Sequence, residues 1–221
     1  MGFEQLAQIV AAHKAAAAAA DDERPIIDVV RRIANRYHNL ARFWSKPQGW
    51  AGPAAAAMLS KARLDRLTKL AKSLQRWVLP TADLDEGDLI LAWANLGALV
   101  DGLLKLHLSV YFTDYVADVA TGKASQAWHH KKELMLDPDG LHLETLILFH
   151  EKADLLNKKQ LEFVRLVQAR RNIIHAFKDA HLGTPQEFIV ALRDYRRLLK
   201  DIALRLPYPD DMYAPTEQGP Y

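Results

Sequence analysis

The sequence predicts an all-α fold. Hydrophobic residues make up 50% of the 221 residues, and in the long segments they recur every three or four positions, the period of a helix with one buried face. Pro and Gly mark the ends of these segments, and no segment convincingly shows the alternation of a strand. We therefore expect a helical bundle at 81–205, with an extra N-terminal helical region at 1–80 and a Pro-rich tail at 206–221.

The N-terminal region should contain three helices. Residues 3–20 are rich in alanine, the best helix former, but they offer little apolar surface to bury. Residues 25–45 carry apolar side chains at helical spacing. A loop with Pro and Gly at 46–53 separates this helix from a third one over 54–78, which should stop at Pro80.

The longest helix is expected over 88–120, and its apolar stripe predicts that it is the central helix. Gly97 and Gly102 should allow close packing of neighbouring helices, since each otherwise weakens a helix. His107 lies in the stripe and is interpreted as a satisfied core histidine. Because Asp101 interrupts the apolar run, we expect a buried core helix and no membrane span.

The C-terminal part should contain three more helices. A connection over 121–140 leads to a short helix at 141–151, and a longer helix follows over 154–177. The next helix, over 185–204, is signalled by a Thr-Pro-x-Glu sequence, which combines an N-cap, a proline at the first position and a capping glutamate. The Pro-rich tail should be extended or disordered.

Composition excludes several kinds of chemistry. The 29 Lys and Arg residues nearly balance 27 Asp and Glu residues, and cysteine is absent, so disulfides, thiol catalysis and thiolate metal sites are ruled out. No secretory signal precedes the helices, which predicts a cytoplasmic protein. His129 and His130, taken with His142 or His150, lack the spacing of a metal site. Glycine-rich phosphate loops are also missing, so we expect neither metal nor cofactor.

Arg170 stands where the helical pattern calls for a hydrophobic residue. At 100° per residue, Phe163 and Val167 lie within about 60° of it, whereas His175 lies about 140° away. A buried guanidinium needs an anionic partner. Arg170 could pair with a carboxylate on a neighbouring helix, such as Asp101, or extend to the edge of the apolar face, or line a cleft that binds phosphate. Periodicity alone favours the two structural interpretations.

The segment around Arg170 resembles the motif of HEPN domains, in which Arg precedes His by four to six residues and a polar residue commonly follows the Arg. Arg170 and His175 match this spacing, and Arg171 occupies the polar place. Asn172 stands one position later than the asparagine usual in the family. Phe177 stands where one branch has a tyrosine that a paired antitoxin nucleotidylates, which puts that pairing in doubt.

This resemblance extends over about residues 85–205. It implies a HEPN-type bundle and metal-independent endoribonuclease activity, in which a ribose 2′-hydroxyl attacks the adjacent phosphate. In that reading His175 is the general base or acid, Arg170 stabilises the phosphorane, and Arg171 and Asn172 bind phosphate or RNA.

The resemblance also implies partners. A homodimer through the long helix and the helix of Arg170 would supply a second histidine to the RNA site. A toxin, defence or RNA-processing role would allow an antitoxin or regulatory protein as a further partner. The alternatives are a non-catalytic HEPN-like helical module that binds RNA, a nucleotide or a protein, and a purely structural dimerisation protein.

Overall fold

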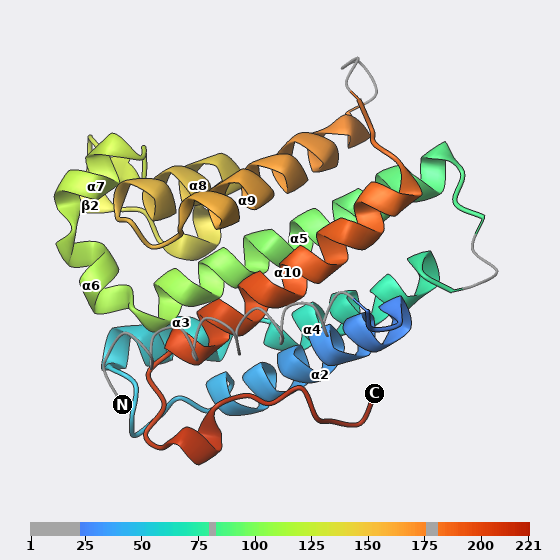
Figure 1. Ribbon diagram of the computed structural model, residues 1–221. Coiled ribbons are helices and arrows are strands. Elements are labelled where there is room, and N and C mark those ends of the chain that lie inside the picture. Colours follow the sequence, from blue (N-terminus) through green and yellow to red (C-terminus); the bar gives the residue numbers. More distant parts are fainter. Residues whose placement is uncertain (1–22, 80–82, 176–180) are drawn as a thin grey trace, which may run out of the picture.

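The computed structural model confirms the all-α prediction. It describes residues 23–79, 83–175 and 181–221, and these contain nine α-helices, four short 3₁₀ helices and one two-stranded sheet. Figure 1 shows the long helices in three layers, with α8 and α9 in one, α5 and α10 in the next, and α2 and α4 in the third. The alanine-rich segment expected to be helical over 3–20 lies outside the described residues.

The N-terminal layer begins with α2 (Ile26–Trp44), which confirms the helix expected over 25–45. The single helix expected over 54–78 was wrong, because the chain is divided there. Its three parts are α3 (Pro53–Lys61), α4 (Leu64–Ser73) and the 3₁₀ helix η1 (Leu74–Trp77).

The break between α3 and α4 has a packing cause. A continuous helix would place Leu59 and Leu64 about 140° apart, yet both side chains are buried. The extended backbone at Ala62 (ψ 133°) lets α3 pack on α5 while α4 packs mainly on α2. Each short helix therefore buries its own apolar face.

The central helix is α5 (Glu86–Val110), and it ends earlier than expected. The remainder of the helix predicted to continue to 120 forms two short helices, α6 (Phe112–Ala117) and α7 (Val119–Ala124). The breaks fall at Tyr111 and Asp118, where ψ is 36° and 65°. Tyr111 donates its hydroxyl to the Arg205 carbonyl, and the Asp118 carboxylate caps α7 by accepting from the Thr121 amide.

Helix α5 is long and apolar enough to cross a membrane by length and composition alone. In the fold it lies between the outer layers and packs against α3, α4, α8, α9 and α10. Its two interior glycines contact neighbouring side chains, Arg171 at Gly97 and Leu67 at Gly102. These contacts identify α5 as the core helix of the fold, as its interrupted apolar run predicted.

The connection after α7 contains the only β-strands of the described residues. Strands β1 (Trp128–His129) and β2 (Leu134–Met135) pair antiparallel, with Trp128 opposite Met135. No strand was expected here, because two residues are too few to show alternation. The 3₁₀ helix η2 (Pro138–Gly140) then leads into α8 (Leu143–Lys152), which confirms the short helix expected at 141–151.

The last two helices are α9 (Lys158–Arg171) and α10 (Pro185–Arg205). Helix α9 starts later than expected because Asn157 and Gln160 form a capping box, and it ends at Arg171 rather than 177. A 3₁₀ turn, η3 (Asn172–Ile174), follows it. The predicted capping box of α10 is present, with Thr184 and Glu187 bonding each other's backbone amides.

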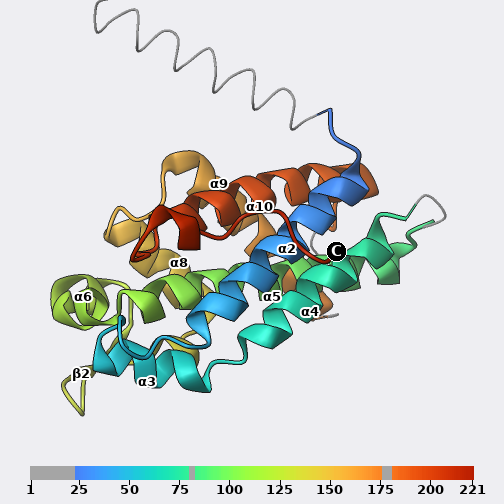
Figure 2. The ribbon, with the colours of Figure 1, turned by 90° about the horizontal axis from the view of Figure 1, so that it is seen from below.

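The Pro-rich tail, which was expected to be extended or disordered, has little regular secondary structure but packs on the rest of the fold. It contains a short 3₁₀ helix, η4 (Asp211–Tyr213), and Figures 1 and 2 show it lying against α2. Glu217 forms ion pairs with Arg32, Arg36 and Arg196. Asn35 bonds the backbone of Glu217 and Tyr221. The tail therefore links α2 to α10 through the ion pairs of Glu217.

Candidate functional site

Arg170 and Arg171 end α9 but face different clefts. Arg170 is buried, with 8% of its surface exposed, and it lines a cavity of about 270 Å³ beside Trp93 and α10. Arg171 is half-buried and lines another cleft, between α5 and the start of α8. The structure therefore does not bring Arg170 and His175 into one cleft.

The anionic partner of Arg170 is Glu187. Its Nη2 lies 3.5 Å from Glu187 Oε1, and the other carboxylate oxygen accepts from the Thr184 amide at 2.7 Å. Gly183, at φ +86°, lies so close that a Cβ there would be 3.2 Å from Arg170 Cζ. Arg170 thus holds the first turn of α10 against the end of α9.

Asp101 is not the partner of Arg170, which corrects the pairing suggested from the sequence. Its carboxylate lies 3.0 Å from Lys105 Nζ, one turn along α5. Asp101 lines the Arg171 cleft, whereas Arg170 lines the other one. Helical spacing could indicate that Arg170 needs a carboxylate, but not which helix supplies it.

The end of α9 changes direction before His175. After η3, His175 has an extended backbone (φ −85°, ψ 92°), and its side chain is exposed. At 100° per residue a straight helix would place His175 about 40° from Arg171 and about 140° from Arg170, so the two clefts agree with the helical projection. His175 comes to line the same cleft as Arg171 and Asn172, a cleft of about 620 Å³.

Two acidic residues that line this cleft are held in ion pairs. Asp101 is paired with Lys105. Glu144 accepts two hydrogen bonds from Arg165 and one from Gln168. The hydrogen bonds from Arg165 hold the pKa of Glu144 below its usual range, so it remains ionised and paired.

Four polar side chains of the cleft are uncommitted. The side chains of His142, Arg171, Asn172 and His175 have no hydrogen bond or ion pair within the ranges that the structure describes. Arg171 is held in place by its stem, which packs over Gly97, where a Cβ would lie 2.6 Å from Arg171 Cδ. The cleft therefore presents one unpaired guanidinium, one amide and two imidazoles.

His142 was missed as a member of this site by sequence reasoning. It is the N-cap residue of α8, exposed, and 33 positions before His175 in the chain. Nothing in its spacing links it to the end of α9. Only the packing of α8 and α9 on α5 brings the two histidines to one cleft. Within the described ranges no three His, Asp or Glu residues form a group that could hold a metal ion.

The chain matches no protein-family model, no curated protein and no solved structure. Its function must therefore be inferred from the residues that line the cleft.

Proposed function

We propose that the protein is a metal-independent endoribonuclease whose active site is the cleft of Arg171, Asn172, His142 and His175. The observation that carries the proposal is the presence of two uncommitted histidines and an unpaired arginine in one cleft. RNA cleavage by internal transfer needs one group to accept a proton, one to donate a proton and a cation near the phosphate.

The reaction follows from these groups. One imidazole accepts the proton of the ribose 2′-hydroxyl, whose oxygen then attacks the adjacent phosphorus. The bond from phosphorus to the 5′-oxygen breaks, and the other imidazole donates a proton to that oxygen. The products are a 2′,3′-cyclic phosphate and a 5′-hydroxyl. Arg171 stabilises the charge of the phosphorane, and Asn172 contacts the phosphate or a neighbouring base.

This proposal departs from the HEPN resemblance in two respects. The motif spacing selected Arg170 and His175, whereas the cleft unites His175 with Arg171, three intervening residues away. The second histidine comes from the same chain, so the chemistry does not require a dimer. A toxin, defence or RNA-processing role in the cytoplasm, with an antitoxin or regulatory partner, remains a prediction from the resemblance.

The experiment is to incubate the full chain with a mixed-sequence RNA in EDTA. Wild type should cut the RNA, and His142→Ala, His175→Ala and Arg171→Ala should each reduce the initial rate at least about tenfold. His130→Ala is the matched control, because His130 is an exposed histidine in the β1–β2 hairpin, outside the cleft. Its rate should equal that of wild type.

Two other results would contradict the proposed activity or its location in this cleft. RNA that is bound in EDTA but never cut would identify the non-catalytic module instead. Equal rates for wild type and the three cleft variants would place any nuclease activity elsewhere or in a contaminant.

A further inference from the structure

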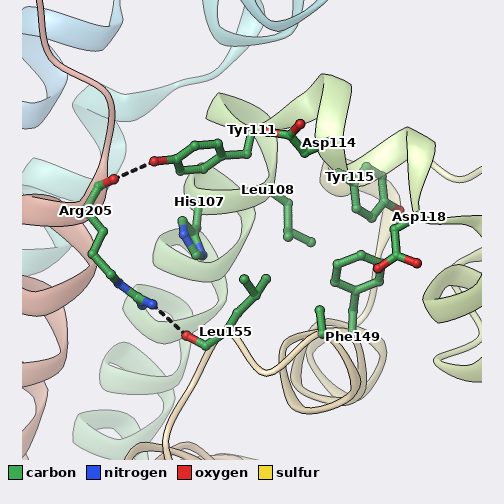
Figure 3. Close-up of a pocket in the computed structure, with 10 residues that line it drawn as sticks. His107, Leu108, Tyr111, Asp114, Tyr115, Asp118, Phe149, Leu155 and Arg205 are labelled. Carbon is green, nitrogen blue, oxygen red and sulfur yellow. Dashed lines mark hydrogen bonds between the residues drawn. The ribbon is translucent and has the colours of Figure 1, made fainter.

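A second cavity lies at the C-terminal end of α5 and shares no lining residue with the cleft of His142 and His175. Its volume is about 390 Å³, within the range of small-molecule sites. Its walls are largely aromatic, formed by Tyr111, Tyr115 and Phe149 (Figure 3). The rings of Tyr115 and Phe149 are 4.9 Å apart. Ala153 and Leu155 add aliphatic surface.

Most polar groups around this cavity are already engaged. Tyr111 donates its hydroxyl to the Arg205 carbonyl, and Arg205 Nη1 donates to the Leu155 carbonyl, as Figure 3 shows. Tyr115 donates to the Leu136 carbonyl at 2.6 Å. Asp118 accepts from the Thr121 amide. These bonds fix the walls and leave few polar groups for a ligand.

His107 is the buried polar residue of the cavity that can still accept a hydrogen bond. Its Nδ1 lies 3.2 Å from Nε2 of His150, whose own Nδ1 lies 2.8 Å from the Leu146 carbonyl. A carbonyl only accepts, so Nδ1 of His150 carries a proton. Burial lowers the pKa of His107 to about 3 and that of His150 to about 4, so both rings are neutral at pH 7.

The tautomers of the pair follow from this. With Nδ1 protonated, neutral His150 presents an acceptor at Nε2, so His107 donates from Nδ1. His107 Nε2 is therefore an acceptor, and it has no partner in the described part of the chain. The residue is only 4% exposed and lines the cavity. Its Nε2 can therefore accept a hydrogen bond from a donor in the cavity.

Charges around the cavity differ in sign. Arg205 lies at one end, and Asp114 and Asp118 lie at the other (Figure 3). Opposite charges at the two ends give the cavity no single preference for an anion or a cation. A neutral aromatic ring suits the aromatic walls, because rings pack edge to face.

We propose that this cavity binds a small neutral aromatic molecule that carries one N–H or O–H donor, of the indole or phenol class. Its ring packs against Tyr115, Phe149 and Leu155, and its donor bonds His107 Nε2. This site is independent of the proposed ribonuclease activity.

Calorimetric titration of the full chain with indole tests the proposal, and benzothiophene is the matched ligand, with the same ring shape and no N–H. Indole should bind saturably and about tenfold more tightly than benzothiophene, the effect of one hydrogen bond. Ala153→Phe should fill the cavity and abolish indole binding, with the helical circular dichroism unchanged. Absence of saturable indole binding, equal affinity for the two ligands, or undiminished binding by Ala153→Phe would each overturn the proposal.

The ¹⁵N chemical shifts of the His107 ring provide a second measurement that does not depend on a variant. We expect Nδ1 protonated and Nε2 unprotonated at pH 7, with the Nε2 shift moving when indole binds. A proton on Nε2 in the free protein would also overturn the proposal.

Discussion

The two adjacent arginines at the end of α9 illustrate how the surroundings of a residue decide its role. Arg170 is buried against Glu187 and Gly183. Arg171 lies over Gly97 with its charge toward the cleft. A charge that is already paired contributes to the fold, whereas an unpaired charge is available to a phosphate. We therefore assign a structural role to Arg170 and the phosphate contact to Arg171.

Alanine substitutions should separate these roles. Arg170→Ala should lower the free energy of unfolding by about 1–2 kcal/mol, because Glu187 is partly exposed and its ion pair is screened. Arg171→Ala should change it by less than about 0.5 kcal/mol but reduce RNA cleavage at least about tenfold. Urea denaturation and initial rates, measured on both variants, provide the comparison. The assignment fails if Arg170→Ala keeps full stability and loses cleavage.

Glu217 should make stability depend on pH. Burial opposes its ionisation, but hydrogen bonds from Arg196 and Arg32 outweigh burial and lower its pKa to about 2 from the usual 4.5. Because the folded state has the lower pKa, the ion pairs stabilise the protein above about pH 4.5, and this stabilisation is lost as the pH falls toward 2.

Glu217→Gln tests this linkage. At pH 7 the variant should be less stable than wild type by about 2 kcal/mol, and the difference should shrink between pH 5 and pH 3. Urea denaturation at each pH measures it. A difference that stays constant over this range would show that the carboxylate charge of Glu217 is not what fastens the tail.

At the scale of elements, the sequence predicted those helices whose ends and buried faces are determined by residues close together in the chain. The capping sequence at Thr184 and the helical period of α2 both predicted their helices. The break at Ala62, the turn at Tyr111 and the end of α9 depend on which neighbour each segment packs against, and a single sequence does not contain that information. The same limit explains why only part of the candidate site was predicted. His175 was predicted from its spacing to Arg170, whereas His142 lies in the cleft only because α8 and α9 pack on α5.

Gly97 links the packing of α5 and α9 to the site. In Gly97→Ala the added methyl would meet the stem of Arg171 at 2.6 Å. Crowding of about 1–3 kcal/mol should exceed the helix-propensity gain of up to about 1 kcal/mol. We expect a loss of about 1 kcal/mol of stability and at least about a tenfold loss of RNA cleavage.

The control for this prediction is Gly140→Ala. A Cβ at Gly140 would meet nothing within 4 Å, so both stability and cleavage should remain at wild-type values. Thermal unfolding and initial rates report the two quantities. Wild-type cleavage in Gly97→Ala would show that the position of Arg171 does not matter to the reaction.

At the scale of the whole molecule, one hydrophobic core joins the N-terminal helices to the rest. It contains Val30 and Tyr37 of α2 as well as Leu99 of α5, Val167 of α9 and Leu199 of α10. The N-terminal region, which the HEPN resemblance left unexplained, is thus an integral layer of this domain. It covers one side of α5 and α10 and leaves the cleft on the opposite side.

The homodimer was expected to form through the long helix and the helix of Arg170, but α5 is largely buried, so we propose that its face lies on α9 and α10. Leu166 and Val190 are exposed by 40% and 58% and line one surface cavity. Leu166→Glu combined with Val190→Glu should convert a dimer to a monomer in light scattering. Because His142 and His175 belong to one chain, the monomer should still cut RNA. Loss of cleavage on dissociation would instead indicate a site shared between two copies.

The most direct test of the central claim uses two strands of one sequence, one RNA and one DNA, incubated with wild-type protein in EDTA. Attack by a 2′-hydroxyl predicts that the RNA is cut to fragments ending in 2′,3′-cyclic phosphate, that the DNA stays intact, and that His142→Ala and His175→Ala leave both strands largely uncut. Intact RNA, cleavage of the DNA strand, or products without cyclic phosphate would contradict the mechanism proposed for this cleft.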